Sequence, residues 1–126
     1  MKHAFVVALA LAFLSIAVDT SATPRKPARA RPFTATAYCK RGETASGAHT
    51  RVGIAAADPR LIPLGSTVRI THPSVRGTYA IQDSGVKGRR IDIFMPSCRD
   101  ARRFGKKRVQ VQIVHLAAAD SPGQQR

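Results

Sequence analysis

The chain has 126 residues and carries 21 lysine and arginine side chains against seven acids, which gives a formal net charge of +14. This length leaves room for one domain, and a hydrophobic content of 44% argues against a wholly disordered chain. The two cysteines and four scattered histidines lack the spacing of metal ligands, so we expect neither a zinc finger nor any other metal site or cofactor. Any mechanism that needs carboxylates must choose from a short set: Asp19, Glu43, Asp58, Asp83, Asp92, Asp100 and Asp120.

The N-terminal segment has the features of a secretory signal peptide. A basic start at Lys2 precedes an apolar run over residues 4–18 that only Ser15 interrupts, and small residues follow up to Ala22. We expect cleavage after Ala22, so that residues 1–22 leave and the mature protein is secreted or periplasmic, in the cell envelope. The alternative is an uncleaved membrane anchor, but an apolar run of about fifteen residues is short for a membrane span, and no later segment is long enough either.

Two further segments are expected to lie outside the folded domain. Residues 23–32 hold three prolines and four basic side chains, a composition that favours an extended, solvated linker. The alternative is an arm that binds an anionic polymer. Residues 117–126 are expected to form a flexible tail, which leaves a domain over residues 33–116.

Export gives the two cysteines a structural interpretation. In an oxidising compartment Cys39 and Cys98 are expected to form a disulfide, because they are the only pair in the chain. The bond would close a loop of about 60 residues and contribute roughly 4 kcal/mol in the loop-entropy model. The alternative, a catalytic thiol, lacks a recognisable basic partner beside either cysteine.

Short segments of alternating apolar and polar residues predict a β-rich domain. Glycines and prolines separate these segments, which cover residues 33–38, 67–71, 78–82, 91–94 and 108–114. Several short strands with many turn signals favour a barrel or a sandwich. One short helix is expected after Ser97, which can cap it, with Asp100 three residues on and Gly105 at its end. Asp100 is thereby assigned a structural role.

Three of the remaining acids stand in unusual surroundings. Asp58 precedes a proline, Asp83 opens a glycine-containing loop, and Asp92 lies between Ile91 and Ile93 in a predicted strand. Because side chains alternate along a strand, Asp92 would face away from the core, where a small barrel can border a groove. Each acid also has a structural alternative: a turn former at Asp58, a loop cap at Asp83 and an ion-pair partner at Asp92.

Five short motifs, in order along the chain, resemble those of the three-aspartate (3D) domain family. The motifs are Ala35-Thr36-Ala37-Tyr38, Thr44-Ala45-Ser46-Gly47, Ala57-Asp58-Pro59-Arg60-Leu61-Ile62-Pro63-Leu64-Gly65, Asp83-Ser84-Gly85-Val86-Lys87-Gly88 and Arg90-Ile91-Asp92-Ile93-Phe94. The family is similar to the catalytic barrel of membrane-bound lytic transglycosylase A and to secreted muralytic stationary-phase proteins. The resemblance implies an all-β fold, a small six-stranded double-psi β-barrel with the one short helix, and peptidoglycan glycan strands as substrate.

The resemblance also implies roles for individual residues. Asp92 matches the family's catalytic acid, Asp83 its close partner and Asp58 its third aspartate. Thr36 and Tyr38 match the opening strand, where they would line the site and contact substrate. The loop that Asp83 opens is two residues shorter than the family's usual loop, and the chain has no room for the second, substrate-clamping domain of the larger transglycosylases. These departures imply a shallow groove and weak activity.

The implied reaction is lytic transglycosylation of the bond between N-acetylmuramic acid and N-acetylglucosamine. Asp92 would protonate the glycosidic oxygen and then accept a proton from the sugar's own C6 hydroxyl, which closes a 1,6-anhydro ring. Basic neighbours at Lys87, Arg89 and Arg90 would hold Asp92 ionised, whereas burial and a carboxylate at Asp83 would favour the proton. The basic side chains, Lys87 among them, are therefore expected to turn toward carboxylates of the substrate's peptides.

Two other classes of function compete with this one. The same barrel could hold peptidoglycan or anionic envelope polymers without cutting them, although the absence of tryptophan leaves few platforms for sugar stacking. The high positive charge, dense between Arg99 and Arg108, suggests nucleic acid, but export and the lack of a nucleic-acid motif argue against that partner. Glu43 has no role that the sequence indicates.

Overall fold

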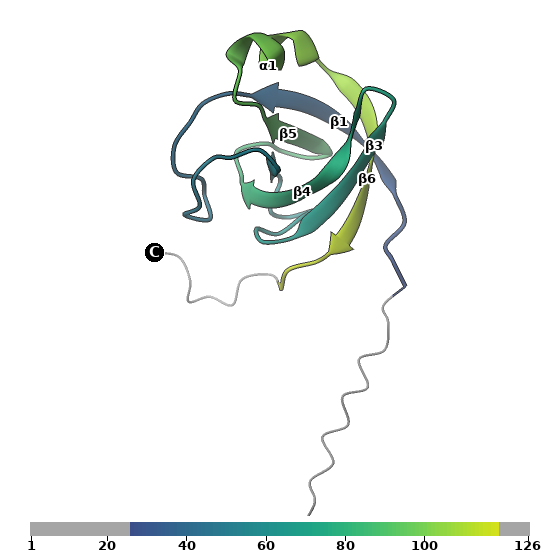
Figure 1. Ribbon diagram of the computed structural model, residues 1–126. Helices are drawn as coiled ribbons and strands as arrows, with labels where there is room; N and C mark the ends of the chain where they lie inside the picture. Colours follow the sequence, from purple (N-terminus) through teal and green to yellow (C-terminus); the bar gives the residue numbers. More distant parts are fainter. Residues whose placement is uncertain (1–25, 119–126) are drawn as a thin grey trace, which may run out of the picture.

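A computed structural model describes residues 26–118, which form a closed six-stranded barrel with one short helix (Figure 1). The predicted all-β fold is therefore confirmed. The expected signal peptide (1–22), the start of the expected linker (23–25) and the end of the expected tail (119–126) lie outside the described residues. The elements are β1 (Arg31–Tyr38), β2 (Ile54–Ala57), β3 (Thr67–His72), β4 (Val75–Asp83), β5 (Arg90–Phe94), α1 (Cys98–Phe104) and β6 (Lys107–His115).

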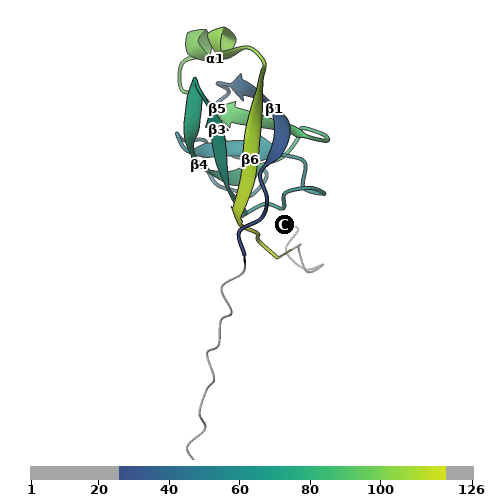
Figure 2. The same cartoon turned by 90° about the vertical axis from the view of Figure 1, so that its right-hand side faces the viewer.

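The barrel closes in the order β1-β5-β2-β4-β3-β6, with β6 paired back onto β1. The pairs β1–β5 and β2–β4 are parallel, and the other pairs are antiparallel. Parallel neighbours need long connections, so the barrel joins segments that are far apart in the sequence. Figure 2 shows α1 at one end of the barrel and both ends of the described chain at the other.

Each of the five predicted strands is present and is longer than its alternating segment. β1 starts at Arg31 because Arg31 and Pro32 already pair with β6. β4 contains Gly77, which the sequence suggests as a separator between strands. A Cβ atom at Gly77 would lie 3.2 Å from Cε2 of Tyr79, so glycine here makes room for the tyrosine ring within the strand.

The strand that sequence patterning misses is β2. All four of its residues are buried, so no polar position alternates with the apolar ones. β2 lies between β4 and β5 and places Ala55 and Ala57 in the core. The largest fully buried core side chains are those of Ile54, Ile62, Ile70, Ile81, Ile91, Ile93, Val68 and Val109.

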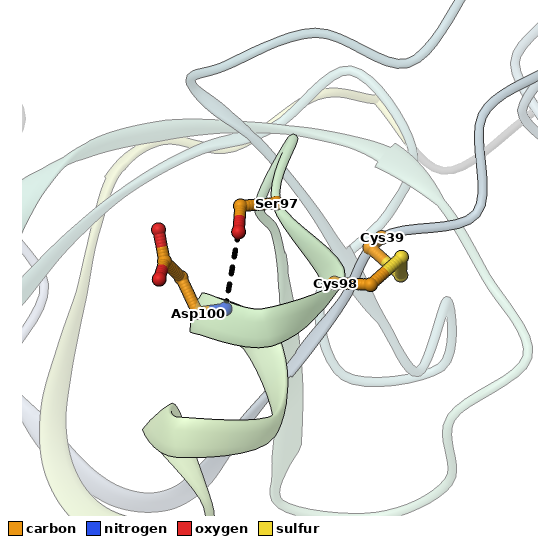
Figure 3. The surroundings of a disulfide bond; sticks show 4 residues. All are labelled: Cys39, Ser97, Cys98 and Asp100. Carbon is orange, nitrogen blue, oxygen red and sulfur yellow. Dashed lines mark hydrogen bonds between the residues drawn. A yellow bond between two sulfur atoms is a disulfide. The ribbon is translucent and has the colours of Figure 1, made fainter.

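The short helix forms where the sequence predicts it. Ser97 caps its start, and the Ser97 hydroxyl accepts a hydrogen bond from the backbone amide of Asp100 at 3.2 Å (Figure 3). Gly105 ends the helix with a φ of 64°, a conformation that favours glycine. Ala101 and Phe104 are buried, and the helix packs against β1. No helix within residues 26–118 is long and apolar enough to cross a membrane.

The predicted disulfide between Cys39 and Cys98 is also present, with an S–S distance of 2.03 Å (Figure 3). Cys39 directly follows β1, and Cys98 is the first residue of α1. The bond therefore ties the end of β1 to the start of the helix, beside Tyr38, the last residue of β1.

Candidate active site

A row of backbone partners crosses four neighbouring strands and brings two aspartates together. Thr36 of β1 pairs with Asp92 of β5, Asp92 pairs with Ala56 of β2, and Ala56 pairs with Asp83 of β4. Neighbouring strands lie about 4.8 Å apart, so one intervening strand separates the Cα atoms of Asp92 and Asp83 by roughly 10 Å. The Ala56 side chain ends at its Cβ atom, so it places no long group between the two carboxyls.

The Asp92 carboxyl is half-buried, and its surroundings shift its pKa upward. Burial raises the pKa of Asp92 above its ordinary value, and the negative charge of Asp83 adds to that shift. Two groups act in the opposite direction and lower the pKa of Asp92: the Thr36 hydroxyl, which donates to Oδ1 at 3.0 Å, and the Arg90 guanidinium. Burial is the largest of these effects. The sequence predicts that burial and Asp83 raise this pKa while basic neighbours lower it, and Arg90 is the basic neighbour that lowers it.

A loop of the chain holds Asp83 in place. Oδ1 of Asp83 accepts hydrogen bonds from the backbone amides of Ala45 at 3.1 Å and Ser84 at 2.9 Å. The amide of Ser46 donates to the carbonyl of Gln82 at 3.0 Å, which ties the same loop to the end of β4. The motif Thr44-Ala45-Ser46-Gly47 therefore supports Asp83, a role that the sequence alone does not show.

The loop that carries Ala45 is itself closed by local contacts. Glu43 and His49 form an isolated antiparallel bridge at its base. The buried side chain of Thr44 donates to the carbonyl of Ala48 at 2.7 Å. Glu43, for which the sequence suggests no role, thus belongs by its backbone to the support of the Asp83 loop.

The Asp58 carboxylate makes four hydrogen bonds, none of them to Asp83 or Asp92. Its side chain is 3% exposed, and Arg60 binds both carboxylate oxygens, at 3.0 and 2.7 Å. The backbone amides of Arg60 and Gly88 also donate to it, at 3.0 and 2.8 Å. The Arg60 side chain, followed by the Gly88 amide, holds the pKa of Asp58 well below its usual range. Through its hydrogen bond from Gly88, Asp58 therefore connects the loop that begins at Asp83 to the turn after β2.

Tyr38 presents a buried hydroxyl to the aspartate pair. This hydroxyl has no hydrogen-bond partner within residues 26–118. Burial raises the pKa of Tyr38 to about 12, and the charges of Asp83 and Asp92 contribute to the shift. The ring meets Phe94 edge-on, with centroids 5.5 Å apart. Tyr38 therefore remains a protonated donor close to both carboxyl groups.

Lys87 is exposed and lies away from this row. It lines a surface hollow together with Asp58, Arg60 and Ser84. Among residues 26–118, no cluster of three or more His, Cys, Asp or Glu side chains is arranged to hold a metal ion.

A model of the 3D domain family matches residues 54–117, about half of the chain. The chain belongs to the 3D domain family.

Three relatives in Bacillus subtilis (strain 168) are similar to it. The cell wall-binding protein YocH is 32% identical over 108 residues, which cover 79% of this chain and 37% of YocH. The putative cell wall shaping protein YabE is 35% identical over 89 residues, which cover 66% of this chain and 21% of YabE. The prophage-derived uncharacterized protein YorM is 34% identical over 107 residues, which cover 73% of this chain and 45% of YorM.

The chain spans less than half the length of each of these relatives. All three aspartates of the 3D domain lie within the family match, whereas Thr36 and Tyr38 precede it. The barrel register is what brings β1, and with it these two residues, to Asp92. Sequence reasoning missed Arg60 as the partner of Asp58, although its position two residues later was a visible signal.

Proposed function

We propose that this 3D domain protein is a lytic transglycosylase that cleaves peptidoglycan between N-acetylmuramic acid and N-acetylglucosamine. The observation that carries the proposal is the half-buried Asp92 carboxyl, whose pKa is raised by burial and by the neighbouring Asp83. A general acid must hold a proton near the operating pH, and this environment favours the protonated form. The second carboxylate, Asp83, lies beyond one intervening strand, where it can face positive charge that develops on the sugar.

In the proposed reaction Asp92 works first as an acid and then as a base. Its proton passes to the glycosidic oxygen, the bond from that oxygen to C1 of the muramic acid breaks, and N-acetylglucosamine leaves with the new hydroxyl. The sugar ring becomes oxocarbenium-like. The C6 hydroxyl of the same sugar then attacks C1 and gives its proton to the Asp92 carboxylate, which forms the 1,6-anhydro ring and restores the acid. No water and no cofactor is consumed.

The surrounding residues would support this cycle in different ways. The Thr36 hydroxyl donates to Asp92 and would stabilise its carboxylate form after the first proton transfer. The buried Tyr38 hydroxyl would donate to the Asp83 carboxylate and so help to hold the pair in place. Asp58 would serve the site by fixing the loop from Asp83 to Gly88 rather than by touching substrate. Lys87, being exposed, would contact substrate at the surface hollow that it lines.

The proposed location and chain organisation agree with this substrate. One relative is named a cell wall-binding protein and another a putative cell wall shaping protein. We therefore propose that the chain is exported by a signal peptide over residues 1–22 and acts in the cell envelope. After cleavage, residues 23–32 would form a linker whose last two residues already belong to β1, followed by the rest of the domain to residue 116 and a short tail at residues 117–126.

A non-catalytic wall-binding module is the second candidate, because one relative is named for cell-wall binding. In this alternative the same barrel would hold glycan strands or anionic envelope polymers, and the charge of +14 would provide attraction without cleavage. The two candidates differ in a single observable property, the appearance of new sugar ends.

Digestion of purified peptidoglycan separates the candidates. We expect the oxidised wild-type protein to release 1,6-anhydro-muropeptides, detected by mass spectrometry, and Asp92→Asn to lower this release at least about a hundredfold. The matched control is Asp100→Asn, an exposed acid on α1, which should keep full activity. Thermal unfolding of both variants shows whether the fold is retained.

Two results would contradict the proposal. Full release by a folded Asp92→Asn variant would remove Asp92 from the mechanism. Unchanged peptidoglycan that co-sediments with the wild-type protein would establish the binding module instead of the enzyme.

A further inference from the structure

A hollow of about 200 Å³ opens on the barrel, and separate parts of the chain build it. Its apolar lining includes Phe33 of β1, Ile62 of the β2–β3 connection and Val111 of β6, all of them buried core residues. Leu61, 44% exposed, also contributes to the wall. We call this hollow the arginine pocket, because Arg29, Arg31 and Arg89 complete its lining.

The three arginines make the pocket strongly attractive to an anion. They come from three places: Arg29 lies before β1, Arg31 is the first residue of β1, and Arg89 directly precedes β5. No aspartate or glutamate lines the pocket. Among the ion pairs within residues 26–118, none involves any of the three guanidinium groups. Their charge is therefore available to a ligand.

The combination of an apolar floor and a cationic rim selects the chemistry of that ligand. A carboxylate accepts the paired hydrogen bonds of a guanidinium, and a small apolar group beside it gains from burial on the floor. A bare phosphate would gain nothing from the floor. A long acyl chain would not fit, because 200 Å³ corresponds to roughly seven water volumes at about 30 Å³ each.

We propose that the arginine pocket binds the free C-terminal carboxylate of a short peptide whose last residue has a small apolar side chain. This inference rests on the proposed function, since peptidoglycan carries a short peptide on its muramic acid, the sugar on which Asp92 would act. Arg89 stands three residues before Asp92, about 10 Å along an extended backbone. About three residues of an extended peptide span that distance. The pocket, which shares no lining residue with the aspartate site, would then hold the end of the peptide while the sugar lies at Asp92.

The test uses N-acetyl-Ala-Ala in its L,L and D,D forms, each as the free acid and as the C-terminal amide. Binding to the isotope-labelled, oxidised full chain is followed by NMR titration. We expect the free acid to shift the amides of residues lining the pocket, and the C-terminal amide to bind roughly tenfold more weakly or worse, because it has lost the charged acceptor. Arg31→Gln and Arg89→Gln should each weaken binding of the acid by a similar factor. Arg76→Gln is the matched control, because Arg76 is an exposed residue of β4 outside the pocket. This variant should bind the acid as tightly as the wild type.

Equal affinity for the acid and the amide would overturn the inference, as would shifts that map away from the pocket. Unchanged affinity in both pocket variants would do the same, and so would displacement of the dipeptide by an equal concentration of inorganic phosphate. The titration needs no cleavage of peptidoglycan. If the dipeptide binds as expected while the wild-type protein releases no anhydro sugar, the peptide site stands and the transglycosylase proposal fails. If anhydro sugar is released but the dipeptide does not bind, the transglycosylase proposal stands and the peptide site fails.

Discussion

Loss of the Cys39–Cys98 disulfide should remove a large part of the stability of this domain. The bond joins residues 59 apart in the sequence and encloses β2 to β5 within its loop. In the loop-entropy model, closing a loop of this length costs the unfolded chain about 14 cal/mol/K, which is about 4 kcal/mol at 25 °C. Small domains are stable by roughly 5–15 kcal/mol in total. In a domain of this size, 4 kcal/mol corresponds to a fall in Tm of at least about 15 °C.

Urea unfolding of four samples measures this effect. They are the wild-type protein with and without a phosphine reductant, and the double variant Cys39→Ser/Cys98→Ser with and without it. We expect the reduced wild-type protein and both samples of the variant to agree within about 1 kcal/mol and to lie about 4 kcal/mol below the oxidised wild type. Since Ala101 and Phe104 still bury the helix, we expect the fold to persist. A loss below about 1 kcal/mol would refute the loop-entropy reasoning, because the enclosed loop is long.

Two further predictions concern the aspartates. Thr36→Val removes a donor that lowers the pKa of Asp92, so this pKa should rise further, and the alkaline limb of the activity profile should move to higher pH. Carboxyl ¹³C NMR titration follows the pKa whether or not the protein is active, and a downward shift would contradict the argument. Asp58→Ala should lower the Tm by at least roughly 5 °C at pH 7, whereas the exposed control Asp100→Ala should change it little. Because the folded-state pKa of Asp58 is depressed, its stabilisation is fully present above about pH 4, the ordinary carboxyl pKa, and is lost as the pH falls further. The Tm difference between wild type and Asp58→Ala should therefore shrink between pH 5 and pH 2, and a constant difference would show that the charge is not the cause.

The parts of the fold that the sequence predicts are those in which one chemical signal dominates locally. Strands with one buried and one exposed face alternate visibly, and α1 is marked by Ser97 and Gly105 at its ends. β2 has no such signal, because all four of its residues are buried. Its place between β4 and β5 depends on pairing partners that are distant in the sequence, which no local pattern contains.

The arrangement of the candidate site also depends on strand pairing that no local sequence pattern contains. Resemblance to the 3D domain family indicates Asp58, Asp83 and Asp92 together, but it does not show how the last two are brought together. Their proximity follows from the registers of three strand pairs that meet at Ala56 and Asp92. The ion pair of Asp58 with Arg60, which contacts both carboxylate oxygens, depends on the conformation of the turn after β2.

The excess of positive charge and the raised pKa of Asp92 have separate structural causes. Charges at the surface are largely screened beyond about 8–10 Å at physiological salt, so most of the net charge of +14 acts only weakly on the Asp92 carboxyl. Arg90 is the cation that lowers its pKa, and burial together with Asp83 outweighs that effect. Arg89, although it is next to Arg90 in the sequence, lines the arginine pocket instead. The chain can therefore carry a large excess of cations while the pKa of one carboxyl is still raised, because that shift is made by burial and a few close neighbours.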